Sequence, residues 1–346
     1  MKKIVLTGGG TGGHVIPNIA ILPLLHSNFD EIHYIGSKNG IEKEIISKYP
    51  KIKYHSITTV KLKRSLSLSN LTIPFKLIAG IIQSKKLLKT INPNVIFSKG
   101  GFVAVPVVLA HGKIPVVGHE SDMTLGLANK LILKRCKAMC CSFEKTTKNI
   151  GKKAVYTGSP IRQDFIQSSS NLIKFSNTKP TLLVIEGSLG STALNNAVWN
   201  NFNTLLKKYN VIHLVGKGKF NKSLSNKDYI QLEQTNDMSK IYHSTDYVMS
   251  RAGSNTVFEI MALHLPSVLV PLPKTESRGD QIDNAKELSQ KGLCKLLFQE
   301  NIDSKSLINT LSQLEKDKNK IVSNLIKQDF SQGNKKIVEV ILNYSL

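Results

Sequence analysis

Two glycine-rich stretches of this 346-residue chain have the composition of phosphate-binding turns. The first reads GGGTGGH at residues 8–14 and the second reads GSLGS at residues 187–191, and each directly follows a short apolar run. Glycines at the end of a strand let backbone N–H groups and the start of the next helix face a phosphate without interference from Cβ atoms. Two such turns indicate two similar α/β halves and a phosphorylated ligand. His14 adds an imidazole, whose unperturbed pKa near ~6.5 suits proton transfer.

Further polar groups occur where other apolar runs end. The segments are SKGGF at residues 98–102, HESD at residues 119–122 and RAGSNT at residues 251–256. Open α/β sheets bind ligands at the carboxyl ends of their strands, so the imidazole and carboxylates of HESD are candidates for catalysis. Glu259 lies about one turn into the helix that residues 251–256 open. It either complements the helix dipole or accepts the two hydroxyls of a ribose, and the residues alone leave both interpretations open.

The first glycine stretch also matches the dinucleotide-binding pattern GxGxxG through Gly8, Gly10 and Gly13. That interpretation needs an acidic residue at the end of the second strand to hold a ribose diol. The strand ends Tyr34-Ile35-Gly36-Ser37 without a carboxylate, so a nicotinamide cofactor is disfavoured. A Walker A loop is excluded because no Gly-Lys-Ser/Thr follows the glycines.

The elements that must position these groups alternate between strand and helix along the chain. Continuous apolar runs are typical of parallel strands that are buried on both faces, and their alternation with helices predicts two doubly wound domains. The expected strands are residues 3–6, 32–35, 95–97, 115–118, 155–157, 181–185, 211–215, 247–250 and 267–270. A polar stretch after residue 166 separates the halves, and a last helix is expected at about residues 335–344.

Charge is distributed unevenly over the chain. The net charge is +23, of which residues 1–160 carry +17 (24 Lys and Arg against 7 Asp and Glu). Such a basic half is typical of proteins that bind nucleic acid, an anionic membrane or a phosphorylated substrate. The apolar segment 71–82, followed by Lys85, Lys86 and Lys89, is either a membrane-docking segment or an ordinary core-facing helix. No apolar run reaches the length of a spanning helix, so the sequence predicts a soluble or peripheral protein.

Eight motifs, in order over some 280 residues, resemble one known family: GGGTGGH, SKGGF, HESD, GLANK, GSPIR, GSLGS, SRAGSNTVFE and RGDQIDNA. The sequence is similar to the peptidoglycan N-acetylglucosaminyltransferases of the MurG family, which convert lipid I to lipid II. The resemblance implies an α/β GT-B fold, in which two Rossmann-like doubly wound domains face a cleft. It implies an acceptor- and membrane-binding domain at residues 1–161, completed by a C-terminal helix at about 333–346, and a UDP-GlcNAc-binding domain at residues 162–332.

The resemblance also assigns site residues. Those expected to contact UDP-GlcNAc are Thr11, Gly12, Gly13, Arg162, Ser188, Met238, Ser254, Asn255, Thr256, Glu259, Asp280 and Gln281. Those expected to contact the acceptor, lipid I (undecaprenyl-diphosphate-linked muramyl pentapeptide), are Gly10, His14, Gly100, Gly101 and Asn129. The implied reaction is an inverting hexosyl transfer with His14, Glu120 or Asp122 as the catalytic base. No DxD motif is present, so no metal and no cofactor are expected. The implied location is peripheral, on the cytoplasmic face of the membrane, where segment 71–82 would dock on anionic lipid.

Three departures from the family pattern affect these assignments. Glu186 stands where the family usually has glycine, and its carboxylate either points away from the phosphate turn or alters it. Ser121 and Asp122 replace the more common glutamine and asparagine, and Val60 replaces a common glycine. Two alternatives keep the fold: a UDP-GlcNAc 2-epimerase and a glycolipid glycosyltransferase. A nucleic-acid-binding protein is disfavoured, because only 6% of residues are aromatic and none cluster near the lysines.

Overall fold

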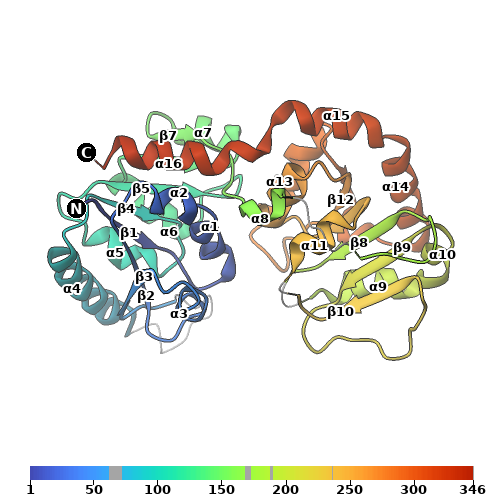
Figure 1. Ribbon diagram of the computed structural model, residues 1–346, viewed down its shortest axis with the longest axis horizontal. Coiled ribbons are helices and arrows are strands. Elements are labelled where there is room, and N and C mark those ends of the chain that lie inside the picture. The colour runs from blue at the N-terminus through green and yellow to red at the C-terminus, as the bar shows by residue number, and fades with distance from the viewer. Residues whose placement is uncertain (62–71, 168–172, 188–189, 236, 346) are drawn as a thin grey trace. The chain divides into compact units, whose positions relative to one another are not determined.

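The computed structural model describes residues 1–61, 72–167, 173–187, 190–235 and 237–345. The chain forms two compact units, shown in Figure 1: unit 1 comprises Met1–Arg162 and Gln332–Leu346, and unit 2 comprises Gln163–Ser331. Each unit is a parallel sheet with helices on its faces, so the predicted α/β doubly wound class is confirmed.

The sheet of unit 1 has the order β3-β2-β1-β4-β5-β6-β7, and all its pairings are parallel. The strands are β1 (Lys3–Thr7), β2 (Glu31–Ser37), β3 (Ile52–Ile57), β4 (Val95–Ser98), β5 (Val116–Glu120), β6 (Ala138–Cys141) and β7 (Ala154–Tyr156). Sequence patterns predict five of these and miss β3 and β6. The order changes direction between β1 and β4, and this is where doubly wound sheets bind ligands.

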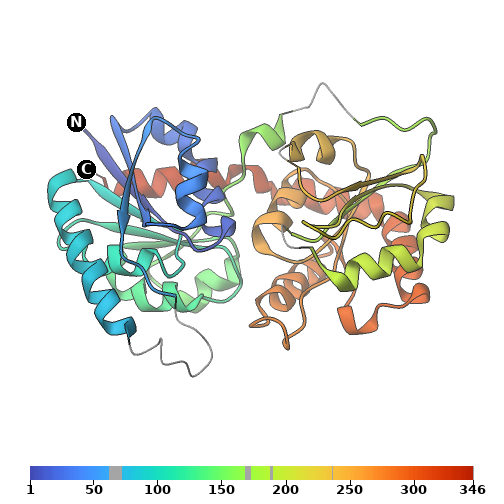
Figure 2. The same ribbon diagram turned by 90° about the horizontal axis from the view of Figure 1, so that it is seen from below.

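Helices cover both faces of this sheet, because strand residues alternate between two cores. Ile4 and Leu6 pack with Ile337 of the last helix, whereas Val5 packs with Leu88 and Ile91 on the opposite face. Figure 2 shows α4 flanking that second face. The helices are α1 (Ile16–Ala20), α2 (Leu22–His26), α3 (Ile41–Ile46), α4 (Ile73–Ile91), α5 (Ala104–Leu109), α6 (Leu127–Ile132), α7 (Glu144–Ile150) and α16 (Gly333–Asn343), with 3-10 turns η1 (Gly12–His14) and η3 (Leu133–Arg135).

The last helix, α16, is fastened to unit 1 by Asn334. Its side-chain amide donates to the carbonyl oxygens of Ile161 (2.6 Å) and Ala20 (3.1 Å), and its Oδ1 accepts from the Ile161 N–H (2.8 Å). Gly333 is required beside it, because a Cβ atom there would lie 2.0 Å from the Ser159 carbonyl oxygen. A chain segment from the far end of the sequence therefore completes the core of the first unit.

Unit 2 repeats the same strand order, β10-β9-β8-β11-β12-β13. Its strands are β8 (Thr181–Ile185), β9 (Asn210–Leu214), β10 (Tyr229–Leu232), β11 (Tyr247–Ser250), β12 (Ser267–Leu269) and β13 (Lys295–Leu296), of which β10 and β13 escape prediction. Its helices are α8 (Gln163–Ile166), α9 (Thr192–Asn200), α10 (Phe202–Lys208), α11 (Met238–His243), α12 (Ser254–Ala262), α13 (Asp280–Gln290), α14 (Ser304–Lys316) and α15 (Lys318–Gln328), with 3-10 turns η4 (Gln299–Asn301) and η5 (Phe330–Gln332). The equivalent ligand-binding edge lies after β8 and β11.

Candidate active site

The ligand-binding edge of unit 1 is formed by the turns after β1, β4 and β5. The turn after β4 rests on the glycine loop after β1, because a Cβ atom at Gly101 would lie 2.4 Å from the Gly9 carbonyl oxygen and 3.3 Å from the His14 ring. A Cβ atom at Gly100 would lie 2.7 Å from Asn129 Oδ1. Gly100 has φ of +86° and Gly101 has φ of +77°, a backbone conformation that residues with a side chain rarely adopt. The structure therefore brings Gly100, Gly101, His14 and Asn129 together at one edge.

His14 lies in the first glycine loop and contacts Thr11, whose Oγ1 is 3.0 Å from its Nδ1. If Nδ1–H donates to that hydroxyl, the basic lone pair lies on Nε2, which is the tautomer that a general base needs. Gly10 has φ of +87°, and a Cβ atom there would lie 2.3 Å from the Phe102 ring. Apart from its two chain neighbours, no described residue has an atom within 4 Å of a Cβ position at Gly12, so the described part of the loop surface is open there.

A buried carboxylate, which the sequence analysis does not identify, supports this loop from α3. Glu42 is fully buried, and its Oε2 accepts from the Gly10 N–H (3.2 Å) while its Oε1 accepts from the Ser37 N–H (2.9 Å). It also accepts a short hydrogen bond from the Ser37 hydroxyl. An acid does therefore stand just beyond the second strand. Its oxygens bind the protein's own donors, so it supports the loop instead of offering itself to a ribose.

Glu120, one of three predicted base candidates, is bound on both oxygens. It accepts from the N–H groups of Asp122 (3.1 Å) and Gly126 (2.8 Å) and from the Asn129 amide (2.9 Å). Burial, and to a lesser extent the Asp122 carboxylate, raises the pKa of Glu120. These bonds fix the turn that carries Asp122 and Asn129. Glu120 therefore positions its neighbours. Asp122, in contrast, is partly exposed.

Lys99 is a second buried group that was not assigned from sequence. It directly follows β4, is 2% exposed, and its Nζ donates a short hydrogen bond to the Ser121 hydroxyl. Burial lowers the pKa of Lys99 to about 8, although the nearby Glu120 and Asp122 carboxylates oppose that shift. His119 is fully buried, and burial together with Lys99 holds its pKa well below the ordinary value, which keeps the ring neutral. The sequence pattern that could have identified Lys99 is a lysine between an apolar strand and two glycines.

In unit 2 the described residues of the second glycine stretch, 187, 190 and 191, lie close to the segment that follows β9. Gly187 and Gly190 have φ of +83° and +68°, and a Cβ atom at Gly190 would lie 2.1 Å from the Val215 carbonyl oxygen. Ser191 then caps α9, because its hydroxyl accepts from the Leu194 N–H (3.3 Å). Ser188, which was expected to contact the diphosphate, lies outside the described residues.

The carboxylate of Glu186 points into unit 2 and away from solvent. Its side chain is completely buried, its Oε2 accepts from the Ser191 N–H (2.5 Å), and its Oε1 is 3.3 Å from His213 Nε2. The carboxylate is therefore turned into the unit and is bound to Ser191, the last residue of the glycine stretch. Arg251 approaches Ser191 from the other side and donates a short hydrogen bond to its hydroxyl.

Three helices converge at the carboxyl ends of β11 and β12. The Tyr242 hydroxyl of α11 donates to Glu259 Oε2 of α12 (3.0 Å), so the helix that begins at Met238 is joined to the predicted ribose-binding carboxylate. Gly253 is the N-cap residue of α12, and no side chain caps the helix there. A Cβ atom at Gly253 would lie 4.0 Å from Gln281 Nε2 of α13. The structure thus gathers Met238, Ser254, Glu259, Asp280 and Gln281 on neighbouring elements.

Comparisons with known proteins agree with this geometry. The glycosyltransferase family 28 N-terminal domain matches residues 4–141, and the family's C-terminal domain matches residues 181–341. A Clostridium tetani protein is 45% identical over 99% of this chain and 98% of its own length, and a Clostridium botulinum protein is 44% identical over 100% of both chains. Both are named UDP-N-acetylglucosamine--N-acetylmuramyl-(pentapeptide) pyrophosphoryl-undecaprenol N-acetylglucosamine transferase. The chain belongs to the MurG family.

Solved structures support the same fold for this MurG-family chain. Acinetobacter baumannii MurG superposes with a TM-score of 0.75 at 23% identity and covers 99% of this chain and 100% of its own. The kitacinnamycin glycotransferase superposes with a TM-score of 0.80 at 11% identity and covers 99% of each chain. The GT-B architecture of two Rossmann-like units is therefore shown, and the chain is a hexosyltransferase of family 28.

The remaining donor residues predicted for this MurG-family chain lie in separate units. Thr11, Gly12 and Gly13 lie in or beside η1 of unit 1, and Arg162 is the last residue of unit 1 before the chain enters unit 2. Asn255 and Thr256 lie in the first turn of α12 in unit 2. Asp280 opens α13 beside Arg278, whose guanidinium is 3.4 Å from its carboxylate. Gln281 Oε1 accepts from the Leu272 N–H (3.0 Å), which orients its amide.

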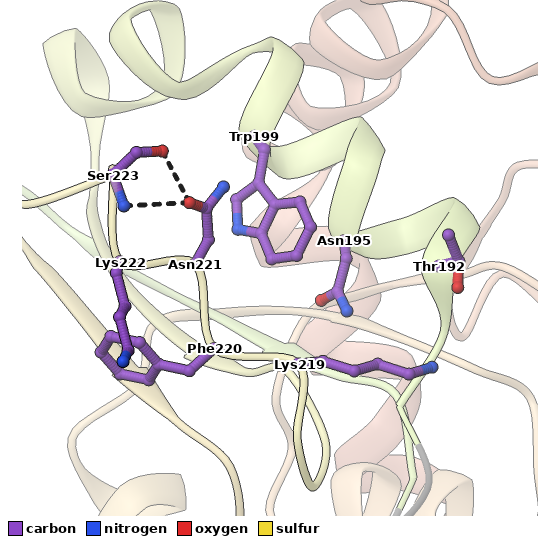
Figure 3. Close-up of a pocket in the computed structure, with 8 residues that line it drawn as sticks. All are labelled: Thr192, Asn195, Trp199, Lys219, Phe220, Asn221, Lys222 and Ser223. Carbon is purple, nitrogen blue, oxygen red and sulfur yellow. Dashed lines mark hydrogen bonds between the residues drawn. The ribbon is translucent and has the colours of Figure 1, made fainter.

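A pocket of about 560 Å³ lies between α9 and the segment after β9, and none of the described residues that line it is a sequence-predicted site residue. Figure 3 shows Trp199, Asn195 and Thr192 projecting from α9 toward this segment, and the other lining residues are Lys219, Phe220, Asn221, Lys222 and Ser223. Within the described residues, no group of three or more His, Cys, Asp or Glu side chains is arranged to hold a metal ion. Among the same residues, no helix is both long and apolar enough to span a membrane.

Proposed function

We propose that this chain transfers N-acetylglucosamine from UDP-GlcNAc to the 4-hydroxyl of the muramyl sugar of lipid I, which forms lipid II for peptidoglycan. The full-length 45% identity to a named transferase of this activity carries the proposal. Two units of the same strand order, each with a glycine turn at its ligand-binding edge, suit a reaction between two diphosphate-bearing substrates.

Unit 2 binds the donor in this proposal. The N-terminus of α12, whose N-cap residue is Gly253, offers N–H groups to the diphosphate. Glu259, oriented by the Tyr242 hydroxyl, accepts the ribose hydroxyls, and the start of α11 at Met238 borders the base. As UDP leaves, negative charge grows on its phosphate oxygens. Fixed helix dipoles and Arg162 stabilise that charge more in the transition state than in the bound substrate.

Unit 1 binds the acceptor. The backbone of Gly10, Gly100 and Gly101 and the side chain of Asn129 surround the acceptor diphosphate, and His14 receives the proton of the attacking hydroxyl. The acceptor oxygen bonds to the anomeric carbon while the bond from that carbon to the UDP oxygen breaks, so the configuration inverts. His14 takes the proton on Nε2 and UDP carries away the electron pair. Asp122 is the alternative base, while Glu120 holds both Asp122 and Asn129 in place.

Membrane docking occurs through unit 1 at the cytoplasmic face. Phe75, Ile78 and Ile82 of α4 are 76%, 55% and 63% exposed, and their spacing puts them on one side of the helix. Leu127 and Leu131 of α6 are both 57% exposed, and α5 contacts both α4 and α6. Sequence analysis did not identify this second pair of residues. Lysines on both helices would add about 1 kcal/mol each near an anionic bilayer.

The test is incubation of the purified chain with labelled UDP-GlcNAc and a lipid I analogue in mixed micelles, followed by chromatography of the lipid products. The proposal expects label in a lipid-linked disaccharide, with UDP released in equal amount. Label that stays with nucleotide sugar, and appears as UDP-ManNAc without acceptor, would refute transfer and support an epimerase. A reaction with a neutral glycolipid but not with lipid I would refute the acceptor assignment.

A further inference from the structure

Glu186 is the feature of unit 2 that the proposed reaction does not use. It directly follows β8, at the position where the donor-binding turn begins, and its carboxylate is completely buried. A negative charge behind a diphosphate-binding turn is unfavourable for the substrate unless it serves another purpose. Its contacts indicate that purpose, because one oxygen accepts from the N–H of Ser191, the residue that joins the turn to α9.

The second carboxylate oxygen is joined to a chain of hydrogen bonds through His213, Tyr229 and Trp199. Trp199 Nε1 can only donate, and it lies 3.2 Å from the Tyr229 hydroxyl. Burial raises the pKa of Tyr229, so its hydroxyl keeps its proton and donates to His213 Nδ1 (2.8 Å). The Nε2–H of His213 then donates to Glu186 (3.3 Å). With the Glu186 carboxylate at its end, this chain gives each of its donors an acceptor.

Ser191 is held from two sides as a result. Glu186 accepts from its N–H, and Arg251 donates to its hydroxyl. Arg251 is 7% exposed and also donates to the carbonyl oxygens of Val270 (3.2 Å) and Pro271 (3.4 Å) and to Gln299 Oε1 (2.5 Å), so it is anchored to the rest of the unit. The guanidinium and the Glu186 carboxylate attract each other electrostatically. The buried negative charge therefore has a cation near it, beside the turn.

We propose that Glu186 and the buried His213–Tyr229 pair behind it are positioning residues, which fix the backbone of Ser191, and with it Gly187 and Gly190, at the donor diphosphate. This inference rests on the proposed function, because it takes the turn as the diphosphate site. Glu186 does not touch the substrate. It acts through Ser191, so its effect belongs to the donor and not to the acceptor.

The variant Glu186→Gln distinguishes a positioning role of Glu186 from mere repulsion of the diphosphate. A glutamine keeps the shape, but its NH₂ group would face His213 Nε2 and force the ring to accept there. Nδ1–H would then donate to the Tyr229 oxygen, and the Tyr229 hydroxyl proton would lose its partner in the chain. If Glu186 positions the turn, losing this charge-assisted arrangement raises the KM for UDP-GlcNAc by about 10-fold or more. If Glu186 only repels the diphosphate, the same variant lowers that KM.

The experiment measures KM for UDP-GlcNAc, KM for the lipid I analogue, kcat, and UDP binding by calorimetry. Asp228→Asn is the matched control, because Asp228 is also a largely buried carboxylate, held by Lys179 (2.7 Å), but at the opposite end of the same strands. The inference expects Glu186→Gln to weaken UDP binding about 10-fold with acceptor KM within 2-fold of wild type, and Asp228→Asn to leave both constants unchanged. Equal or tighter UDP binding by Glu186→Gln overturns it, as does an equal loss in both variants.

Tyr229→Phe keeps the test decisive if Glu186→Gln does not fold. It removes only the hydroxyl that orients His213, and it should raise the KM for UDP-GlcNAc in the same direction by a smaller factor, about 3-fold. An unchanged donor KM in folded Tyr229→Phe would overturn the role of the pair. Failure of the proposed function is distinct, since wild-type protein would then neither bind UDP nor transfer label.

Discussion

Lys99 provides a stability prediction whose size can be calculated. Its amine is buried at the end of β4, and burial lowers its pKa from 10.5 to about 8 in the folded protein. Between these two values the unfolded chain binds more protons than the folded chain. Stability therefore rises with pH across the window from about 8 to 10.5 and is lowest below it, where both states carry the charge.

The magnitude follows from the two pKa values. At 1.36 kcal/mol per pKa unit, the charged amine costs unit 1 about 3.3 kcal/mol at pH 7 relative to a neutral one. At pH 9.5 the folded amine is neutral and the unfolded one is still mostly charged, so the cost falls to about 1.4 kcal/mol. Wild-type protein should therefore gain about 2 kcal/mol between pH 7 and 9.5 relative to a variant without the charge.

Lys99→Met is that variant, and urea unfolding at the two pH values is the assay. Trp199 is the chain's single tryptophan and lies in unit 2, so its fluorescence follows unit 2 whereas circular dichroism follows both units. The transition seen only by circular dichroism reports unit 1. Lys113→Met, at an exposed lysine before β5, controls for loss of charge alone. Identical pH dependence in wild type and Lys99→Met would refute the reasoning.

Three further outcomes follow from the site. His14→Ala should lower kcat by about 100-fold if His14 is the base, and an unchanged kcat with only a raised acceptor KM would show that it orients the phosphate instead. Glu259→Ala should weaken UDP binding in calorimetry by at least 10-fold, since it removes a charged acceptor of two hydroxyls, whereas binding of a ribose-free phosphate should not change. Replacing Phe75, Ile78 and Ile82 together with serine should abolish sedimentation with anionic vesicles while transfer to a soluble acceptor persists. Wild-type sedimentation by the triple variant would exclude α4 as the docking surface.

Much of the sheet architecture follows from the sequence, and the strands that prediction missed have a common cause. β3, β10 and β13 are edge strands, which carry polar residues such as Lys53 and Gln231 and lack the continuous apolar run of a strand buried on both faces. β6 is central but has only four residues, Ala-Met-Cys-Cys, too short and too low in β-branched residues to stand out. The central strands that carry the glycine turns are predictable because burial on both faces demands apolar residues.

The residues of the site also differ in how far the sequence predicts them. Groups in the turns and helices that follow strand ends, such as His14 and Asn129, follow from motif and topology. The residues that hold them do not, because their roles depend on contacts across long sequence separations. Glu42 reaches Gly10 from 32 residues away, and the Tyr242 hydroxyl reaches Glu259 from the neighbouring helix. No local pattern distinguishes such a buried carboxylate or phenol from an ordinary surface residue before the fold is known.

The two units share more than their glycine turns. Each buries a cation and a carboxylate directly behind the ligand-binding edge: Lys99 with Glu120 in unit 1, and Arg251 with Glu186 in unit 2. In both, the carboxylate accepts backbone N–H groups of the adjoining turn, and the cation donates to a serine of that turn, Ser121 or Ser191. A buried carboxylate alone would repel a diphosphate, and a buried cation alone would be costly to desolvate. Paired, they fix the turn with little net charge, so the helix dipoles remain to attract the phosphate. HESD and EGSLGS share no sequence pattern, and the equivalence is visible only in the contacts.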